Sequence, residues 1–145
     1  NGVAARRLLD FVYSGGKVAL FQLQDTAHRR WQLPYPLVVS DDEETLGAIT
    51  MPEHPVFTTP HRLSSLGPVK LYDSLLSADE RWQVLARDGR KQPAIVAASF
   101  GEGKLLLVQA SPDRYVNGDL SGDPLVNPDT CRQFLENVLT WLKQR

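Results

Sequence analysis

The residues whose types could do chemistry follow the most apolar stretch of the chain. Leu105 to Ala110 contains one polar side chain, Gln109, and leads into a polar segment, residues 111–128. Open α/β sheets collect ligands at the carboxyl ends of their strands, so this segment is the expected ligand-binding face. Its carboxylates, guanidinium, phenol and amide can hydrogen-bond a sugar or another small ligand, and they belong to Asp113, Arg114, Tyr115, Asn117 and Asp119.

Part of the same segment follows the opening spacing of a calcium-binding loop. Oxygen-bearing side chains alternate at Asn117, Asp119, Ser121 and Asp123, and a glycine stands at the sixth position. The bidentate glutamate that closes such a loop is absent, because Pro128 occupies its place. The favoured interpretation is a loop whose Asn and Asp side chains bond their own backbone. We therefore predict no metal site, with this loop as a weak calcium candidate.

The remaining reactive side chains form no catalytic constellation. His54 and His61 make neither a helical i, i+4 pair nor a cluster with cysteine, so metal binding and acid–base catalysis are the minor interpretation for both. Cys131, the only cysteine, repeats with Phe134 and Val138 at helical spacing, which predicts a buried thiol rather than a nucleophile. Common enzyme motifs are absent from the sequence. We therefore predict no catalytic residue and no cofactor.

Two apolar runs must position the polar segment. Ala94 to Ala98 and Leu105 to Ala110 flank a turn that contains Gly101 and Gly103. Runs of this kind suit strands covered on both faces, and the glycines allow a tight reversal between them. The sequence therefore predicts a buried antiparallel hairpin.

Helices and further strands are predicted around this hairpin. Residues 1–14 and 127–143 predict helices, the second with Asn127 as N-cap and Pro128 in its first turn. Its apolar stripe is Cys131, Phe134, Leu135, Val138, Leu139 and Leu142. Lys17 to Gln24 predicts a strand inside the sheet, because its apolar run is too continuous for a one-sided surface strand. Further strands are predicted at Leu46 to Met51, Val69 to Leu76 and Trp82 to Ala86, and residues 25–45 predict a loop.

The composition is that of a single globular domain, residues 1–145. The chain is 42% hydrophobic and 23% charged, with a net charge of -1, so it has no overall attraction for nucleic acid or an anionic membrane. Its apolar runs are too short for direct membrane insertion. It begins without methionine, in a predicted helix, so we expect it to be part of a larger protein. One cysteine suits either redox compartment and leaves the localisation unknown.

Four motifs in the same order resemble a class I glutamine-amidotransferase-like domain. They are the helix end and strand through Gly15-Gly16-Lys17-Val18, then His54-Pro55-Val56-Phe57, then Phe100-Gly101-Glu102-Gly103-Lys104-Leu105, and the final helix from Asn127 to Leu142. The resemblance is to the non-catalytic branch, which includes trehalose-utilisation-type proteins, gliding-motility and ABC-transporter auxiliary proteins, and β-galactosidase trimerisation domains. Active members carry a cysteine on a strand-to-helix elbow, with a distant histidine and glutamate. That arrangement has no counterpart here.

The resemblance implies a flavodoxin-like three-layer α/β sandwich. We expect a mixed sheet with a C-terminal antiparallel hairpin, lacking the first strands of that fold. The implied function is a catalytically silent domain of a larger bacterial protein that serves assembly, partner binding or carbohydrate-associated binding. Its partners would be other domains of that protein or a second copy of the chain, with carbohydrate as a further candidate and nucleic acid not expected. The alternative is a hydrolase or small-ligand-binding enzyme with its site on residues 111–128.

Overall fold

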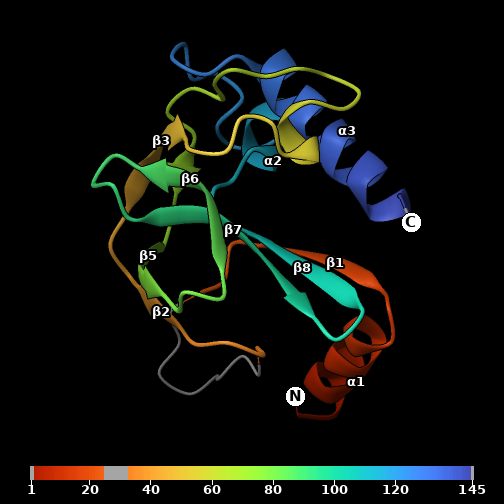
Figure 1. Ribbon diagram of the computed structural model, residues 1–145. Coiled ribbons are helices and arrows are strands. Elements are labelled where there is room, and N and C mark those ends of the chain that lie inside the picture. Colours follow the sequence, from red (N-terminus) through yellow and green to blue (C-terminus); the bar gives the residue numbers. More distant parts are fainter. Residues whose placement is uncertain (1, 25–32, 145) are drawn as a thin grey trace.

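The computed structural model describes residues 2–24 and 33–144 and shows a mixed α/β domain built on an open six-stranded sheet (Figure 1). The helical elements are α1 (Gly2–Tyr13), the 3-10 turn η1 (Pro55–Phe57), α2 (Asp113–Val116) and α3 (Pro128–Lys143). The strands are β1 (Lys17–Phe21), β2 (Leu37–Ser40), β3 (Glu44–Ile49), β4 (Lys70–Leu71), β5 (Ser74–Ala78), β6 (Gln83–Asp88), β7 (Pro93–Phe100) and β8 (Gly103–Val108).

The strands of the main sheet lie in the order β1-β8-β7-β6-β3-β4. β1 runs parallel to β8, and the other neighbouring pairs of this sheet are antiparallel. β2 and β5 form a separate antiparallel pair. The predicted α/β class and mixed sheet are confirmed at this level.

The predicted buried hairpin is confirmed as β7 and β8. The two strands pair from Ile95 opposite Val108 to Phe100 opposite Gly103. A Cβ atom on Gly103 would lie 1.9 Å from the carbonyl oxygen of Val12, at the end of α1. Only glycine allows the turn and the helix to approach so closely. Gly103 therefore allows the end of α1 to pack closely against the hairpin and also helps to reverse the chain.

Different elements cover the two faces of the sheet (Figure 1). Ile95 and Leu106 belong to the apolar cluster on the face that carries α3 and η1. Val96 and Leu107 point to the opposite face and pack in a second cluster with Val12 of α1 and with side chains of β2 and β5. Successive residues of a strand point to opposite faces, so this hairpin contributes to both clusters.

α3 begins where the sequence predicts but turns a different stripe toward the sheet. The side chain of Asn127 accepts a hydrogen bond from the backbone of Asp129, as an N-cap residue should. The predicted stripe is wrong at Leu139, which is 56% exposed. The buried positions of the helix are Cys131, Phe134, Asn137, Val138 and Trp141. The polar Asn137 thus takes a place in the core that the apolar pattern did not indicate.

Three strand predictions need correction. β1 is an edge strand of the described sheet rather than an inner one, because it pairs with β8 alone. The predicted strand from Val69 to Leu76 divides into β4 and β5, which belong to different sheets. β2 lies within the predicted loop of residues 25–45, whose first part, 25–32, is outside the described residues.

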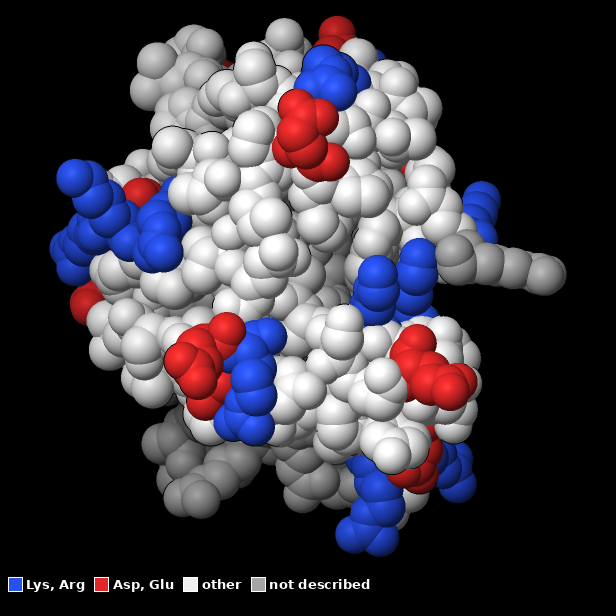
Figure 2. All heavy atoms as spheres, in the orientation of Figure 1, with Lys and Arg blue, Asp and Glu red and all other residues white. Residues whose placement is uncertain are grey.

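Charge is distributed in small groups of both signs. On the face shown in Figure 2, these groups surround a wide uncharged area, and no broad field of one sign is visible there. Within residues 2–24 and 33–144, no helix is long and apolar enough to cross a membrane.

Candidate functional site

A polar pocket of about 370 Å³ lies at the carboxyl ends of β1 and β8. Three segments that are distant in the sequence line it, through Gln22, Leu23, Gln24, Tyr72, Asp73 and Arg114. Because β1 and β8 are parallel, their carboxyl ends meet at the same edge of the sheet. This is the edge at which open α/β sheets bind ligands.

Gln22 and Gln109 shape the segment that follows β1. Gln22 has a φ of +58°, in the left-handed region that non-glycine residues rarely adopt. Gln109 is buried just beyond β8, and its amide bonds to both the backbone N–H and the backbone C=O of Leu23. Its Oε1 accepts from Leu23 N at 3.0 Å, while its Nε2 donates to Leu23 O at 2.6 Å and to Asp73 O at 3.0 Å. One buried amide therefore ties together two of the three segments that line the pocket.

Three of the predicted ligand-binding residues gather around this pocket. Arg114 lines it and donates from Nη1 to Asp119 Oδ1 at 3.1 Å. Asp113 accepts from Gln22 Nε2 at 2.9 Å, across the ends of the two parallel strands. These three side chains therefore lie at the carboxyl ends of β1 and β8, and their role in ligand binding stays a prediction.

The other two predicted residues are placed differently. Tyr115 is buried, and its hydroxyl accepts a hydrogen bond from Lys70 N at 2.9 Å, so it supports the backbone of β4. Asn117 is exposed immediately after α2 and does not line the pocket. A structural role fits Tyr115, because a buried tyrosine hydroxyl needs a hydrogen-bond partner.

Tyr72 connects the charged groups at the pocket. Its hydroxyl donates to Asp119 Oδ2 at 3.2 Å, and the Arg114 guanidinium lies 5.4 Å from its ring centroid. The hydrogen bond from Arg114 lowers the pKa of Asp119, while burial and, next, the bond to Asp119 raise the pKa of Tyr72. At neutral pH the group is thus a carboxylate, a guanidinium and a neutral phenol. It offers hydrogen bonds to a polar ligand rather than a poised general base.

Of the pocket residues that the sequence did not reveal, Gln22 and Tyr72 bond through their side chains to predicted residues. Gln22 directly follows an apolar run. This position is the sequence feature that could have indicated a residue at the carboxyl end of a strand. Tyr72 lies between β4 and β5, which the sequence predicted as a single strand. It reaches the pocket only because these two strands separate there.

The weak calcium candidate has oxygen atoms already in use. Both carboxylate oxygens of Asp119 bond to Arg114 and Tyr72, and Asp123 Oδ1 accepts from Leu125 N at 2.8 Å. The described residues contain no group of three or more His, Cys, Asp or Glu side chains placed to hold a metal ion. The Asp123 contact is a local backbone bond of the kind that the favoured interpretation of this loop predicts.

The remaining reactive side chains lie apart from the pocket. Cys131 is fully buried, as predicted, and burial raises the pKa of its thiol to about 11, so the reactive thiolate is not populated at neutral pH. His61 Nε2, in the loop after η1, lies 2.9 Å from Glu136 Oε2 of α3 in a partly exposed pair. His54 caps η1, because its Nδ1 accepts from Val56 N at 3.2 Å.

Solved structures share this fold at low sequence identity. Cytoplasmic protein STM1381 from Salmonella typhimurium LT2 is 20% identical, with 97% of this chain and 61% of that chain covered and a TM-score of 0.58. Cytoplasmic protein STM3548 from Salmonella typhimurium is 15% identical, with coverages of 95% and 59% and a TM-score of 0.56. The β-galactosidase from Rahnella sp. R3 is 14% identical, with coverages of 97% and 21% and a TM-score of 0.53.

These likenesses establish a shared fold. The chain spans about three fifths of the two Salmonella proteins and about a fifth of the galactosidase. The same fold therefore occurs as one part of longer chains, some of them glycosidases. No protein-family model matches the sequence, and no curated protein sequence matches it.

Proposed function

We propose that the chain is a catalytically silent, amidotransferase-like domain of flavodoxin-like type that serves assembly or partner binding within a larger bacterial protein. The fold's occurrence as a fifth of glycosidase chains supports a non-catalytic, carbohydrate-associated role. The buried Cys131 also supports it, because active members of that family need a reactive cysteine. The observation that carries the proposal is the open edge of β1.

β1 is an apolar strand with one edge unpaired by any described strand. All five of its residues are partly exposed. On the adjacent helix α1, Phe11 and Tyr13 are 56% and 61% exposed. Open apolar edges favour pairing with another strand, and proteins normally cover or interrupt them. A strand from another domain, or from a second copy of this chain, would complete the sheet.

The register identifies the backbone groups that face the open edge. Gly16 O and Gln22 N both bond to β8. In a parallel pair, successive residues direct their backbone groups to alternate sides. The N–H and C=O groups of Lys17, Ala19 and Phe21 therefore face outward. These are the groups that a partner strand would bind.

Hydrogen exchange and light scattering test this proposal. In the isolated chain, the amides of Ala19 and Phe21 should exchange quickly and those of Val18 and Leu20 slowly, and pairing should protect all four. Ala19→Pro removes one outward N–H and no bond to β8, so it should weaken association about tenfold, which is roughly 1.4 kcal/mol. Leu20→Pro is the matched control, since its N–H faces β8 and its loss should destabilise the fold instead.

Two results would contradict assembly through β1. The first is slow exchange of Ala19 and Phe21 in a monodisperse monomer, which would show that the edge is already covered. The second is fast exchange of the same amides in the full-length protein, together with no self-association of the chain.

A second candidate function is the binding of a small polar ligand, including carbohydrate, in the pocket at the carboxyl ends of β1 and β8. The left-handed backbone of Gln22 favours it, because such conformations persist where the surrounding structure imposes them and are common at ligand sites. A hydrolase is less well supported, since Asp113, Arg114, Tyr115 and Asp119 all bond to other protein groups.

Calorimetry with calcium and with a panel of glycans tests the pocket. Asp119→Ala should weaken binding at least about tenfold, because it releases Arg114 and Tyr72 from their present positions. Asp41→Ala, at an exposed position outside the pocket, should leave binding unchanged. If no ligand gives heat or raises the melting temperature, ligand binding here is excluded and assembly remains as the function.

A further inference from the structure

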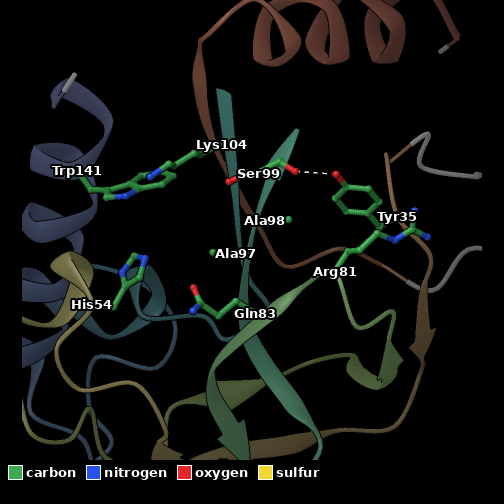
Figure 3. A pocket seen from close by; sticks show the side chains of 9 residues that line it. All are labelled: Tyr35, His54, Arg81, Gln83, Ala97, Ala98, Ser99, Lys104 and Trp141. Atoms are coloured by element: carbon green, nitrogen blue, oxygen red, sulfur yellow. Dashed lines mark hydrogen bonds between the residues drawn. The ribbon is translucent and has the colours of Figure 1, made fainter. Parts of the chain in front are cut away.

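A cleft of about 370 Å³ opens where β6 separates from β7 (Figure 3). The pairing of β6 with β7 starts at Gln83 opposite Ala97, so the last residues of β7 extend beyond it. Tyr35 fills part of the gap by donating its hydroxyl hydrogen to Ser99 O at 2.7 Å. The remaining space is the cleft.

The side chains that line the cleft divide between the two sides of β7. Figure 3 shows Trp141, His54 and Lys104 on one side and Tyr35 and Arg81 on the other. The guanidinium of Arg81 lies 4.5 Å from the ring centroid of Tyr35 and forms a 2.7 Å ion pair with the aspartate two residues earlier. Its charge is thus compensated. The side that carries Lys104 differs, because the charge of Lys104 has no ion-pair partner among the described residues.

That side carries hydrogen-bonding groups that no other described residue uses. They are the Gln83 amide, the Ser99 hydroxyl, the Lys104 ammonium and Nε2 of His54, whose Nδ1 is already the acceptor for η1. An amide and a hydroxyl both donate and accept, so they can bond to the hydroxyl groups of a ligand. An ammonium only donates and prefers an anionic partner.

Positive charge is concentrated at the same side of the cleft. Lys17 donates from Nζ to Trp141 O at 3.1 Å and lies 5.2 Å from the indole centroid, while Lys104 extends toward the same side chain in Figure 3. Burial lowers the pKa of both Lys17 and His54, and the charge of Lys104 lowers each further. Among the described carboxylates, none forms an ion pair with either lysine. Two lysines without an ion-pair partner among the described residues therefore lie at this side of the cleft, and Lys104 lines it.

We propose that this cleft binds a small polyhydroxylated anion, namely a sugar that carries a carboxylate or a phosphate. The acidic group lies beside Lys104 and His54 Nε2, and the hydroxyl groups bond to Gln83 and Ser99. The small side chain of Ala97 leaves the floor of the cleft open, and its volume is in the range of small-molecule sites. Neither the β1 edge nor the pocket at the carboxyl ends of β1 and β8 is needed for this binding.

Calorimetry and amide chemical shifts, measured on the full chain, test the proposal with four probes. D-glucuronate or glucose 6-phosphate should bind saturably and shift the amides of Gln83, Ser99 and Lys104. The preferred one of the two identifies the acidic group as a carboxylate or a phosphate. Glucose and inorganic phosphate should each bind about tenfold more weakly than the preferred acidic sugar. Glucose lacks the acidic group, and inorganic phosphate lacks the sugar hydroxyl groups. Raising the salt concentration should weaken binding, because Lys104 is exposed.

Variants complete the test. Lys104→Gln removes the charge at an exposed position of β8 and should weaken binding about tenfold with an unchanged melting temperature. Lys91→Gln, in the turn at the other end of β7, is the matched control and should bind as the wild type does. Three results would each overturn the proposal: neither acidic sugar shifts the three amides, Lys104→Gln binds undiminished, or inorganic phosphate binds as tightly as glucose 6-phosphate.

Discussion

Asn137→Leu should lower the free energy of unfolding by about 3 kcal/mol, although leucine fits the apolar surroundings and favours the helix. Asn137 is fully buried on α3 and bonds to the backbone of η1 and of the loop that follows η1. Its Oδ1 accepts from His61 N at 2.9 Å, while its Nδ2 donates to Val56 O at 3.0 Å and to His61 O at 2.7 Å. Leucine would leave these three backbone groups without partners, and each unsatisfied buried group costs about 1–3 kcal/mol.

The reciprocal exchange on the same helix is the control. Leu139→Asn changes a side chain that is 56% exposed, so it should alter stability by no more than about 0.5 kcal/mol. Urea unfolding of both variants measures the difference as a shift of midpoint at constant slope. If Leu139→Asn proved the more damaging of the two, α3 would face the sheet with its predicted apolar stripe, and the placement of Asn137 would be wrong.

Gln109→Leu should also cost about 3 kcal/mol and should loosen the segment after β1. The buried amide makes three hydrogen bonds to the backbone of Leu23 and Asp73, which no apolar side chain can replace. We therefore expect a lower urea midpoint together with faster exchange of the Leu23 amide. Any ligand binding in the pocket at the carboxyl ends of β1 and β8 should weaken in parallel, because Gln109 holds two of its segments together.

Gln92→Leu provides the contrast for Gln109. The side-chain oxygen of Gln92 is buried without a hydrogen-bond partner among the described residues, so its removal should be neutral or slightly stabilising. A loss of stability as large as that of Gln109→Leu would mean that burial of the side chain, and not its hydrogen bonds, accounts for both effects. Equal exchange of the Leu23 amide in Gln109→Leu and in the wild type would contradict the bridging role of Gln109.

Local patterns in the sequence predicted the elements whose causes are local. Gly101 and Gly103 reverse the chain between two apolar runs, and this is sufficient for the β7–β8 hairpin. Asn127 and Pro128 set the start of α3 through contacts within a single turn. Cys131 was placed correctly in the core, because it lies where the apolar stripe and the true buried face of α3 coincide.

The candidate site could be predicted only in part. Arg114, Asp113 and Asp119 follow the most buried strand, so their position at the carboxyl end of the sheet was predictable. Their partners Gln22 and Tyr72 are 91 residues from Asp113 and 47 residues from Asp119 along the chain, respectively. No spacing rule connects residues so far apart.

The sequence by itself determined the α/β class, the central hairpin, the ends of α3 and the polar loop beyond β8. Only the tertiary structure decided that β1 lies at an edge, that Asn137 replaces Leu139 in the core and that a cationic cleft opens beside β7. The physical reason is that apolar periodicity reports which residues favour burial, whereas burial of a polar residue depends on partners from elsewhere in the chain. Asn137 is tolerated in the core because Val56 and His61 supply those partners. Strand order is likewise set by which strands meet, and the composition of β1 is equally compatible with an edge or an interior position.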